Sequence, residues 1–264
     1  MDQTNHTFAI CAYRESPYLD ECIISLKEQN LPSRIVLCTS TPNPHIERCA
    51  LLHDLPLFVR TGETDITADW NFAYEQASDD YVTIAHQDDI YCPEYAKTAL
   101  QYLENAKRPL IFFTDYAELR DGTLITENDL LRVKRRMLSP LKVRAFQRSR
   151  FIRRRILSLG DPICCPSVTF AKKNLPSSIF QSGFQSCEDW EAWEKLSRLK
   201  GDFLYSPETL TYHRIHGDSA TTAIIGVNLR NAEDYVMFRK FWPNCIAKAL
   251  TKAYAKSEKS NQLQ

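Results

Sequence analysis

Two adjacent carboxylates, Asp88 and Asp89, directly follow a run of strand-forming residues. The stretch Tyr81–Tyr91 reads YVTIAHQDDIY, with β-branched and small apolar residues before the acids. At the end of a buried strand in an open α/β sheet, such acids can bind a divalent cation together with the phosphates of a ligand. The alternative is an Asp-rich turn that caps the next helix, because Pro93 and Glu94 are typical of a helix start. The pair alone leaves both interpretations open.

A second pair of acids, Glu188 and Asp189, opens a helix that the spacing predicts over 188–199, with Trp190 and Trp193 in its buried stripe. The helix dipole favours acids at this place, which is a sufficient structural reason for them. The dipole would also keep a carboxylate ionised. One of the two acids could then act as a general base toward a hydroxyl that becomes acidic only in the transition state.

The third group is Arg214 and His216, within the stretch 212–219 that reads YHRIHGDS. Strand alternation places these two side chains on one face, with His213 and Ile215 on the other. An Arg can clamp a diphosphate, and a His can donate a hydrogen bond to it or bind the cation. A polar strand end without a ligand is the alternative.

Two weaker features precede these groups. Tyr13, just after the first predicted strand, could stack on a nucleobase, although tyrosines after strands are common. Asp69 and Asn71, near the start of a predicted helix, could bind ribose or phosphate. Asp69 could equally serve only as a helix cap.

The elements that must position these side chains alternate between strand and helix in the first half of the chain. Apolar runs and spacing predict strands at 7–12, 34–39, 57–59 and 81–85, and helices at 16–29, 43–54 and 67–77. In the first helix, Ser16 would be the N-cap and Pro17 the first helical residue. Strands that alternate with helices through short connections imply a mainly parallel sheet covered on both faces.

The second half of the chain has a mixed character. It predicts strands at 110–114, 167–170, 202–205 and 210–213, a hairpin turn at 120–122, and helices at 188–199 and 227–241. The polar tail from Lys256 onward is expected to fray. We therefore expect an α/β half over 1–115, a mixed half of the same domain over 116–225, and a last helix with its tail over 226–264.

The composition is that of an ordinary globular protein. Of 264 residues, 44% are hydrophobic and 25% charged, and no apolar run is long enough to cross a bilayer. The polar start Met1–Thr7 does not resemble a signal peptide, so we expect a cytoplasmic protein. The nine cysteines form no C-x-x-C pair and are interpreted as buried, reduced thiols.

The net charge is zero, but the charge is unevenly distributed. Eleven Lys or Arg and no acid occur within 132–155, interspersed with apolar residues such as Phe146 and Phe151. This basic segment suits an anionic membrane surface or a lipid diphosphate. The alternative is a solvated face, or a patch neutralised by the acidic remainder. The segment contains no nucleic-acid-binding motif, so we expect no nucleic-acid partner.

Taken in this order, the motifs resemble those of family 2 glycosyltransferases, the inverting enzymes of the GT-A fold, from about Phe8 to Thr222. The stretches that carry the resemblance are FAICAYRESPYL (8–19), HQDDIYCP (86–93), CEDW (187–190) and RIHGDS (214–219). The resemblance implies an α/β fold that is GT-A-like, with a Rossmann-type, mainly parallel sheet flanked by helices and a mixed C-terminal half on the acceptor side.

The resemblance also implies roles for the site residues. Asp88 would be the principal ligand of a Mn²⁺ or Mg²⁺ ion, with Asp89 assisting, and Asp189 would be the catalytic base, with Glu188 beside it. Tyr13 would stack on the base of the donor. The donor nucleotide and its diphosphate would contact Ala12, Tyr13, Glu15, Thr39, Ser40, Asp69, Asn71, Gln87, Arg214 and His216.

The chain departs from the family pattern at three places. His86 and Gln87 stand where many members have a further Asp. The second strand ends on Thr39 and Ser40 rather than on acids, so neutral hydrogen bonds would have to hold the base and ribose. Arg14 replaces an Asn that is common after the aromatic residue. These departures concern the identity of the nucleotide more than the reaction.

The function that the resemblance implies is transfer of a hexose from a nucleotide-diphosphate donor, a UDP-sugar, to an acceptor hydroxyl with inversion. The acceptor would be a saccharide or lipid-linked saccharide in bacterial surface polysaccharide or glycolipid synthesis, reached from the inner face of the cell membrane. A sugar-nucleotide nucleotidyltransferase is an alternative, but among seven glycines there is no Gly-rich phosphate loop. A non-catalytic nucleotide-sugar-binding module would not need Glu188 and Asp189.

Overall fold

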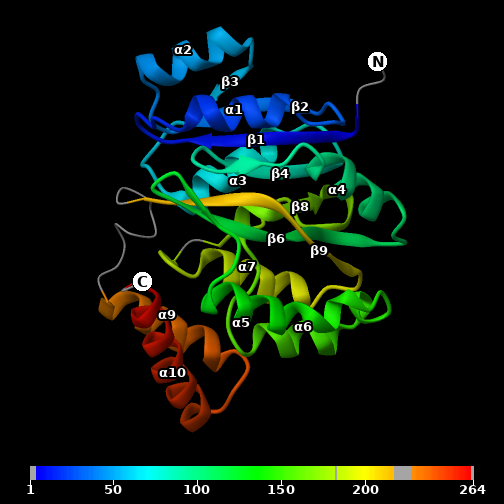
Figure 1. Cartoon of the computed structure of the whole chain (residues 1–264), viewed down its shortest axis with the longest axis vertical. Coiled ribbons are helices and arrows are strands. Elements are labelled where there is room, and N and C mark those ends of the chain that lie inside the picture. Colours follow the sequence, from blue (N-terminus) through cyan, green and yellow to red (C-terminus); the bar gives the residue numbers. More distant parts are fainter. Residues whose placement is uncertain (1–3, 182, 217–226, 263–264) are drawn as a thin grey trace.

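A nine-stranded sheet forms the centre of the molecule, with helices on both of its faces (Figure 1). The computed structural model describes residues 4–181, 183–216 and 227–262. The strand order is β3-β2-β1-β4-β8-β6-β9-β5, and β7 pairs with β6. The strands are β1 (His6–Ala12), β2 (Arg34–Thr39), β3 (Leu57–Val59), β4 (Tyr81–His86), β5 (Ile90–Tyr91), β6 (Pro109–Arg120), β7 (Thr123–Ile125), β8 (Val168–Ala171) and β9 (Asp202–Ile215).

Strand direction divides this sheet into two parallel groups. Strands β3, β2, β1 and β4 run parallel to one another, and β6 runs parallel to β9. Strand β8 lies between the two groups and is antiparallel to both of its neighbours. The expected mainly parallel sheet with a mixed C-terminal half is confirmed.

The helices cover the sheet in two layers. They are α1 (Leu19–Lys27), α2 (Pro44–His53), α3 (Ile66–Gln76), α4 (Tyr95–Glu104), α5 (Asp129–Leu138), α6 (Arg150–Leu157), α7 (Glu188–Ser197), α9 (Val227–Arg239) and α10 (Asn244–Gln262). Four short 3-10 helices add to these, at Ser139–Lys142, Phe146–Arg148, Cys165–Ser167 and Lys172–Asn174. Helices α1, α2 and α4 share one core with the sheet, whereas α3, α7 and the C-terminal helices share the other.

Three expectations about the elements are wrong. Helix α1 begins at Leu19, because the Ser16 hydroxyl accepts the N–H of Tyr18 at 3.3 Å in a turn before the helix. The strands expected at 202–205 and 210–213 form the single strand β9, which pairs with β6 along its length. Between them the register passes from Thr114 opposite Ser206 to Asp115 opposite Thr209. The two residues left over form a bulge that accommodates Pro207.

The C-terminal tail also differs from the expectation. The helix expected at 227–241 ends at Arg239, and a further helix, α10, begins at Asn244 and extends into the tail from Lys256 that we expected to fray. Ala247 is fully buried, and Leu250 and Tyr254 pack against the same core. These three positions lie on one face of a helix, so burial of this face stabilises α10 despite its polar composition. Within the described ranges, no helix combines the length and the hydropathy needed to cross a bilayer.

Arg153 of α6 fixes the C-terminal end of α7. Its side chain is 1% exposed and donates to the carbonyl oxygens of Ser197 at 2.9 Å, Gly201 at 2.6 Å, and Leu199. The guanidinium also lies over the ring of Phe203, 4.7 Å from its centroid. The last carbonyls of a helix lack partners within the helix, so Arg153 satisfies groups that would otherwise be buried without a hydrogen bond.

We therefore expect Arg153→Met to lower the free energy of unfolding by about 3 kcal/mol, because one buried and two partly buried carbonyls lose their donor. Urea unfolding followed by circular dichroism measures the change. The control is Arg150→Met in the same helix, where the side chain is exposed and the expected loss is below about 0.5 kcal/mol. Equal stability of the two variants would contradict the role assigned to Arg153.

Candidate active site

The turn after β4 lies beside the end of β9 because the two-residue strand β5 pairs antiparallel with β9. When this register is continued toward the turn, Asp89 falls opposite His213 and Asp88 opposite Arg214. Residues more than a hundred positions apart in the sequence therefore meet at the carboxyl end of β4. Asp88 and Asp89 therefore lie at the carboxyl edge of the sheet, the position that the sequence predicts for them.

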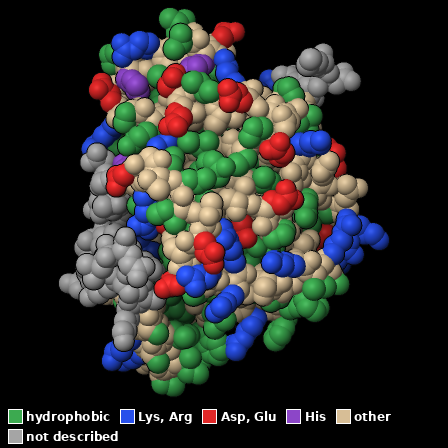
Figure 2. Space-filling model, in the orientation of Figure 1, with side chains coloured by type: hydrophobic (Ala, Val, Ile, Leu, Met, Phe, Trp, Pro, Cys, Tyr) green, Lys and Arg blue, Asp and Glu red, His purple; other side chains and the backbone are tan. Residues whose placement is uncertain are grey.

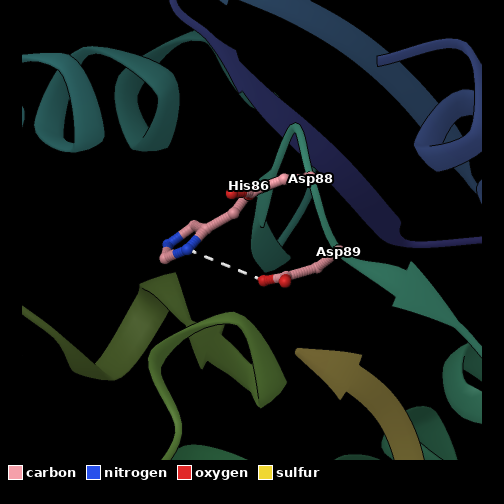
Figure 3. A group of neighbouring side chains, drawn as sticks. All are labelled: His86, Asp88 and Asp89. Carbon is pink, nitrogen blue, oxygen red and sulfur yellow. Dashed lines mark ion pairs between the residues drawn. The ribbon is translucent and has the colours of Figure 1, made fainter. Parts of the chain in front are cut away.

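Asp89 is fully buried, and within the part of the chain that the structure describes only one of its two oxygens forms hydrogen bonds. Its Oδ1 accepts from His213 Nδ1 at 3.0 Å and from the Arg214 N–H at 2.8 Å. Among the described residues, its Oδ2 has no hydrogen-bond partner. His86 Nδ1 lies 3.7 Å from this oxygen, as the dashed line in Figure 3 shows. A buried carboxylate oxygen without a donor is suited to a cation.

Burial and the neighbouring charges together set the protonation of Asp89, His213 and His86. Burial by itself would raise the pKa of Asp89, but His213, His86 and the Arg214 N–H outweigh it and lower this pKa. Burial opposes the charged form of His213, yet Asp89 raises its pKa above the ordinary value. Burial lowers the pKa of His86 despite the nearby carboxylates, so its imidazole is neutral at pH 7.

His86, Asp88 and Asp89 together fit a divalent cation. Each offers one ligand atom, and these atoms all lie within 4.8 Å of one another (Figure 3). His86 is held in place because its ring stacks on Trp70, with centroids 5.1 Å apart and planes at 15°. A neutral imidazole and two carboxylates form a donor set that suits Mn²⁺ and, through the carboxylates, Mg²⁺.

Arg214 holds the backbone of this turn. It is 7% exposed; its Nε donates to the Asp88 carbonyl at 2.8 Å and its Nη2 to Glu21 at 2.5 Å. The guanidinium lies 4.2 Å from the centroid of the Tyr18 ring. His216 Nε2 lies 3.0 Å from Asp88 Oδ2. His216 is therefore at the predicted cation site, and contact of Arg214 with a diphosphate stays a prediction.

The residues expected to contact the base lie just beyond β1. The Gln87 side chain pairs with the Tyr13 backbone in both directions, at 2.9 Å and 3.0 Å. The Tyr13 ring is 39% exposed, with the guanidinium of Arg14 over it at 4.9 Å. Ala12 is buried and Glu15 exposed. Gln87 thus connects the end of β1 with the acidic turn.

A second group of predicted residues forms one network at the end of β2 and the start of α3. Asp69 accepts from Ser40 Oγ at 2.8 Å and from Arg60 Nε at 2.7 Å. Asp69 does not cap its helix, because Asp65 does so by accepting the N–H of Ala68. Thr39, next to Ser40 at the end of β2, is 3% exposed.

Asn71 lies apart from these groups and holds a loop. Its Oδ1 accepts the N–H groups of Ile179 and Phe180 at 3.0 Å each, and its Nδ2 donates to the Phe180 carbonyl at 2.8 Å. The loop and α3 border a cavity of about 430 Å³. Its lining residues are Asp65, Thr67, Ala68, Asn71, Ser178, Phe180, Gln181 and Lys195.

Glu188 and Asp189 open α7, as the sequence predicted. Trp190 and Trp193 are buried at 1% and 0% exposure. Asp189 is half-buried, and its Oδ1 accepts the N–H of Trp190 at 2.7 Å. Glu188 is 4% exposed, and its Oε1 has no hydrogen-bond partner among the residues that the structure describes. Burial raises the pKa of Glu188 from 4.5 to about 7.

Two side chains connect the acidic turn with the start of α7. His86 lies within electrostatic reach of Asp88, Asp89 and Asp189, and Cys164 within reach of both Asp89 and Asp189. The acids after β4 and Asp189 on α7 thus act electrostatically on the same two side chains, and we call the region around His86 and Cys164 their common neighbourhood.

Several residues of this neighbourhood were not predicted. His213 was assigned to the face away from Arg214, yet it contacts Asp89. Asp161, in the loop between α6 and β8, lies within electrostatic reach of Asp189. Glu21, which pairs with Arg214, and Arg60, which pairs with Asp69, were not singled out in the sequence. A loop acid between Gly and Pro, as in GDP at 160–162, was the one signal in the sequence.

Comparison with known proteins gives the family and the fold. Residues 7–175 match the profile of the family described as glycosyl transferase family 2. No curated protein matches the chain. One similar solved structure is S. aureus TarS 1-349 in complex with UDP-GlcNAc, with a TM-score of 0.62, 14% identity, and 93% of this chain and 70% of that chain covered.

Another similar solved structure is the mannosyltransferase PcManGT from Pyrobaculum calidifontis in complex with GDP-Man and Mn²⁺. Its TM-score is 0.58 at 14% identity, with 97% of this chain and 75% of that chain covered. At such identities these likenesses concern the fold, and they agree with the expected GT-A-like architecture.

The raised pKa of Glu188 predicts a pH-dependent effect on stability. The unfolded chain ionises this group near pH 4.5 and the folded protein near pH 7, so the ionisation of Glu188 increasingly destabilises the fold across this interval. Glu188→Gln cannot ionise. Its free energy of unfolding relative to the wild type should therefore rise from pH 4.5 to above pH 7, by up to about 3 kcal/mol.

Urea unfolding of both proteins at pH 5, 6, 7 and 8 measures this difference. Glu127→Gln, at an exposed position, is the matched control and should show no such trend. A difference between Glu188→Gln and the wild type that stays constant with pH would contradict the burial assigned to this carboxyl.

Proposed function

The chain belongs to glycosyl transferase family 2, and we propose that it transfers a hexose from a UDP-sugar to an acceptor hydroxyl with inversion. The observation that carries this proposal is the common neighbourhood of the Asp88–Asp89 turn and Asp189. An inverting transfer needs a base on one side of the sugar carbon and a site for the leaving diphosphate on the other. These two groups of acids provide both.

Asp189 takes the proton in the proposed reaction. The acceptor oxygen forms a bond to the anomeric carbon as its proton passes to the Asp189 carboxylate. The bond from that carbon to the diphosphate oxygen breaks, and its electron pair leaves with the nucleoside diphosphate. No covalent intermediate with the protein is needed. A Mn²⁺ or Mg²⁺ ion bound by His86, Asp88 and Asp89 would neutralise charge on the leaving diphosphate.

The nucleotide would lie at the ends of β1 and β2. The exposed ring of Tyr13 offers a stacking surface, and Gln87 fixes the backbone that carries it. The Ser40–Asp69–Arg60 network supplies a carboxylate close to the end of β2, where the sequence itself lacks one. Asp69 can thus take the place of the acid that many family members have in this strand end. The choice of uridine rests on this end of the site and on the resemblance.

The acceptor would approach over the basic segment, 132–155, which lies on α5 and α6. Several of its cations have internal partners: Arg135 pairs with Asp115, Arg148 with Asp202, and Arg154 with Glu194. The part of the basic segment that stays exposed is smaller and partly apolar. Phe151 is 78% exposed and lies beside the exposed Arg150. Figure 2 shows basic and hydrophobic side chains next to one another over this region.

We propose that this surface contacts the inner face of the cell membrane, where a lipid-linked saccharide acceptor would be reached. An exposed aromatic ring beside arginines suits an anionic lipid surface, because the ring enters the interface while the cations contact the headgroups. A position at the inner face of the cell membrane fits a role in surface polysaccharide or glycolipid synthesis.

The proposed base predicts the behaviour of Asp189→Asn. Turnover of UDP-sugar with acceptor should fall at least about 100-fold, because the amide cannot accept the proton. Binding of UDP with Mn²⁺, measured by calorimetry, should be retained. Asp129→Asn, at an exposed position on α5, is the control and should turn over at the wild-type rate. Wild-type turnover by Asp189→Asn would reject the assignment.

The proposed membrane surface predicts a loss of lipid binding in the double variant Arg150→Ser, Phe151→Ser. Co-sedimentation with vesicles of phosphatidylglycerol and phosphatidylcholine at low salt should weaken about 10-fold, because one cation and one inserted ring are lost. Leu51→Ser is the control, since Leu51 is 84% exposed on α2, far from the basic segment. Equal binding by the three proteins, or none by the wild type, would contradict the proposal.

A further inference from the structure

A pocket bordered by three arginines lies between α6 and the end of α7, two helices that pack against each other (Figure 1). Its volume is about 380 Å³, and the described residues that border it are Arg150, Phe151, Arg154 and Arg198. The first three belong to α6, and Arg198 directly follows α7. Three cations and one aromatic ring therefore face the same space, and these lining residues include no acid. We call this space the arginine pocket.

Glu194 of α7 holds two of these arginines close together. It is 1% exposed, and its Oε1 accepts from Arg154 Nη1 at 2.6 Å and from Arg198 Nε at 2.9 Å, with Arg198 Nη2 at 2.8 Å. Two guanidinium groups thus converge on one buried oxygen. The guanidinium of Arg154 also lies over the ring of Phe241, 5.2 Å from its centroid. Both arginines are therefore positioned before a ligand arrives, which lowers the entropic cost of binding.

The arginine pocket has an excess of positive charge. Glu194 compensates one of its three cations, so the group keeps two positive charges. Arg150 and Arg154 lie four positions apart on α6, where like charges repel each other. An anion in the pocket would remove this repulsion and accept charge-assisted hydrogen bonds from the planar guanidinium groups. A phosphate monoester matches the excess, because it carries about two negative charges near neutral pH.

Exposed apolar side chains beside the arginine pocket favour a lipid as the source of this phosphate. Phe151 at its rim is largely exposed, and so are Val143 and Phe146 earlier in the basic segment. Such side chains can enter the interface of a bilayer while the neighbouring arginines contact the headgroups. A soluble phosphate ester would leave all three apolar side chains in water.

The arginine pocket lies apart from the proposed site of reaction. Asp189 is in the first turn of α7, whereas Arg198 follows the last residue of that helix. At the rise of an α-helix, this places the two residues about 14 Å apart along its axis. A headgroup in the pocket would therefore anchor the protein to the membrane and would not be the hydroxyl group that accepts the sugar.

From these observations we propose that the arginine pocket binds the phosphate of an anionic lipid headgroup, with a preference for a phosphate monoester. Arg154 and Arg198, held by Glu194, form the fixed part of the site. Arg150 adds the third cation, and Phe151 enters the bilayer beside the headgroup. The inference rests on the proposed membrane contact, which it deepens, and it does not depend on the sugar that is transferred.

Co-sedimentation with vesicles, without donor or acceptor, measures the preference. Phosphatidylcholine vesicles would contain either phosphatidic acid, a phosphate monoester, or phosphatidylglycerol, a diester, in fractions that give equal surface potential. The wild type should bind the phosphatidic acid vesicles about 10-fold more tightly, because the monoester offers more charge and more acceptor oxygens to the arginines. Glycerol 3-phosphate has the same phosphate without acyl chains and should bind much more weakly, because Phe151 then has no bilayer to enter.

Two variants test the pocket itself. Arg198→Gln leaves Glu194 paired with Arg154, and Arg150→Gln changes an exposed side chain, so both variants should keep the circular dichroism spectrum of the wild type. Each should lose most of the preference for phosphatidic acid. The matched control is Arg144→Gln, which removes the same charge at an exposed position of the basic segment outside the pocket. It should weaken binding to both kinds of vesicle by a similar factor, about 5-fold at most, and keep the preference.

The outcomes separate this inference from the proposals on which it builds. Equal binding of the wild type to both kinds of vesicle, or a preference that persists in both pocket variants, would overturn the headgroup site and leave the membrane contact in place. Binding to neither kind would reject the site and the membrane contact together. Binding of glycerol 3-phosphate by a protein that binds no vesicle would overturn the assignment to a lipid. The proposed sugar transfer is tested apart from all of these, by Asp189→Asn.

Discussion

The pairing of β5 with β9 is the constraint on which the candidate site depends. Only two residues of β5 take part, yet they set the register that brings His213 and the Arg214 N–H onto Asp89. A fully buried carboxylate without such partners would destabilise the fold by several kcal/mol. The same contacts leave the other oxygen of Asp89 directed toward His86 and, among the described residues, without a hydrogen bond. The interactions that stabilise the turn therefore also prepare it for a cation.

Side-chain spacing predicted most of the strands and helices, because their buried faces repeat with the period of the element. The stripe of α7 and the strand β4, which precedes the turn of Asp88, are examples. Strand β5 could not be predicted, since two residues show no period. His213 was not assigned to the site, because alternation describes a strand and not the turn that lies beside its edge. The bulge around Pro207 similarly made one strand look like two.

Charged residues show the same limit of sequence-based prediction. Within 132–155, Arg153 is buried against the end of α7, whereas Arg150 is exposed, although the sequence gives both the same appearance. Asp161 was not singled out in the sequence, yet it lies within electrostatic reach of the proposed base. Which charge meets which partner is decided by tertiary packing, and this information is not local in the sequence. Because Arg153 of α6 holds the C-terminal end of α7, the basic segment also supports the helix that carries the proposed base.

The central claim is that a donor diphosphate and its cation bind between the Asp88–Asp89 turn and Asp189. A crystal structure of the protein with Mn²⁺ and UDP tests this claim most directly. We expect Mn²⁺ on Asp89 Oδ2 with Asp88 or His86, the diphosphate on this ion, and the uracil against Tyr13, with Asp189 on the open side of the diphosphate. Mn²⁺ bound elsewhere, or UDP bound away from the turn while Asp189 faces neither, would contradict the account.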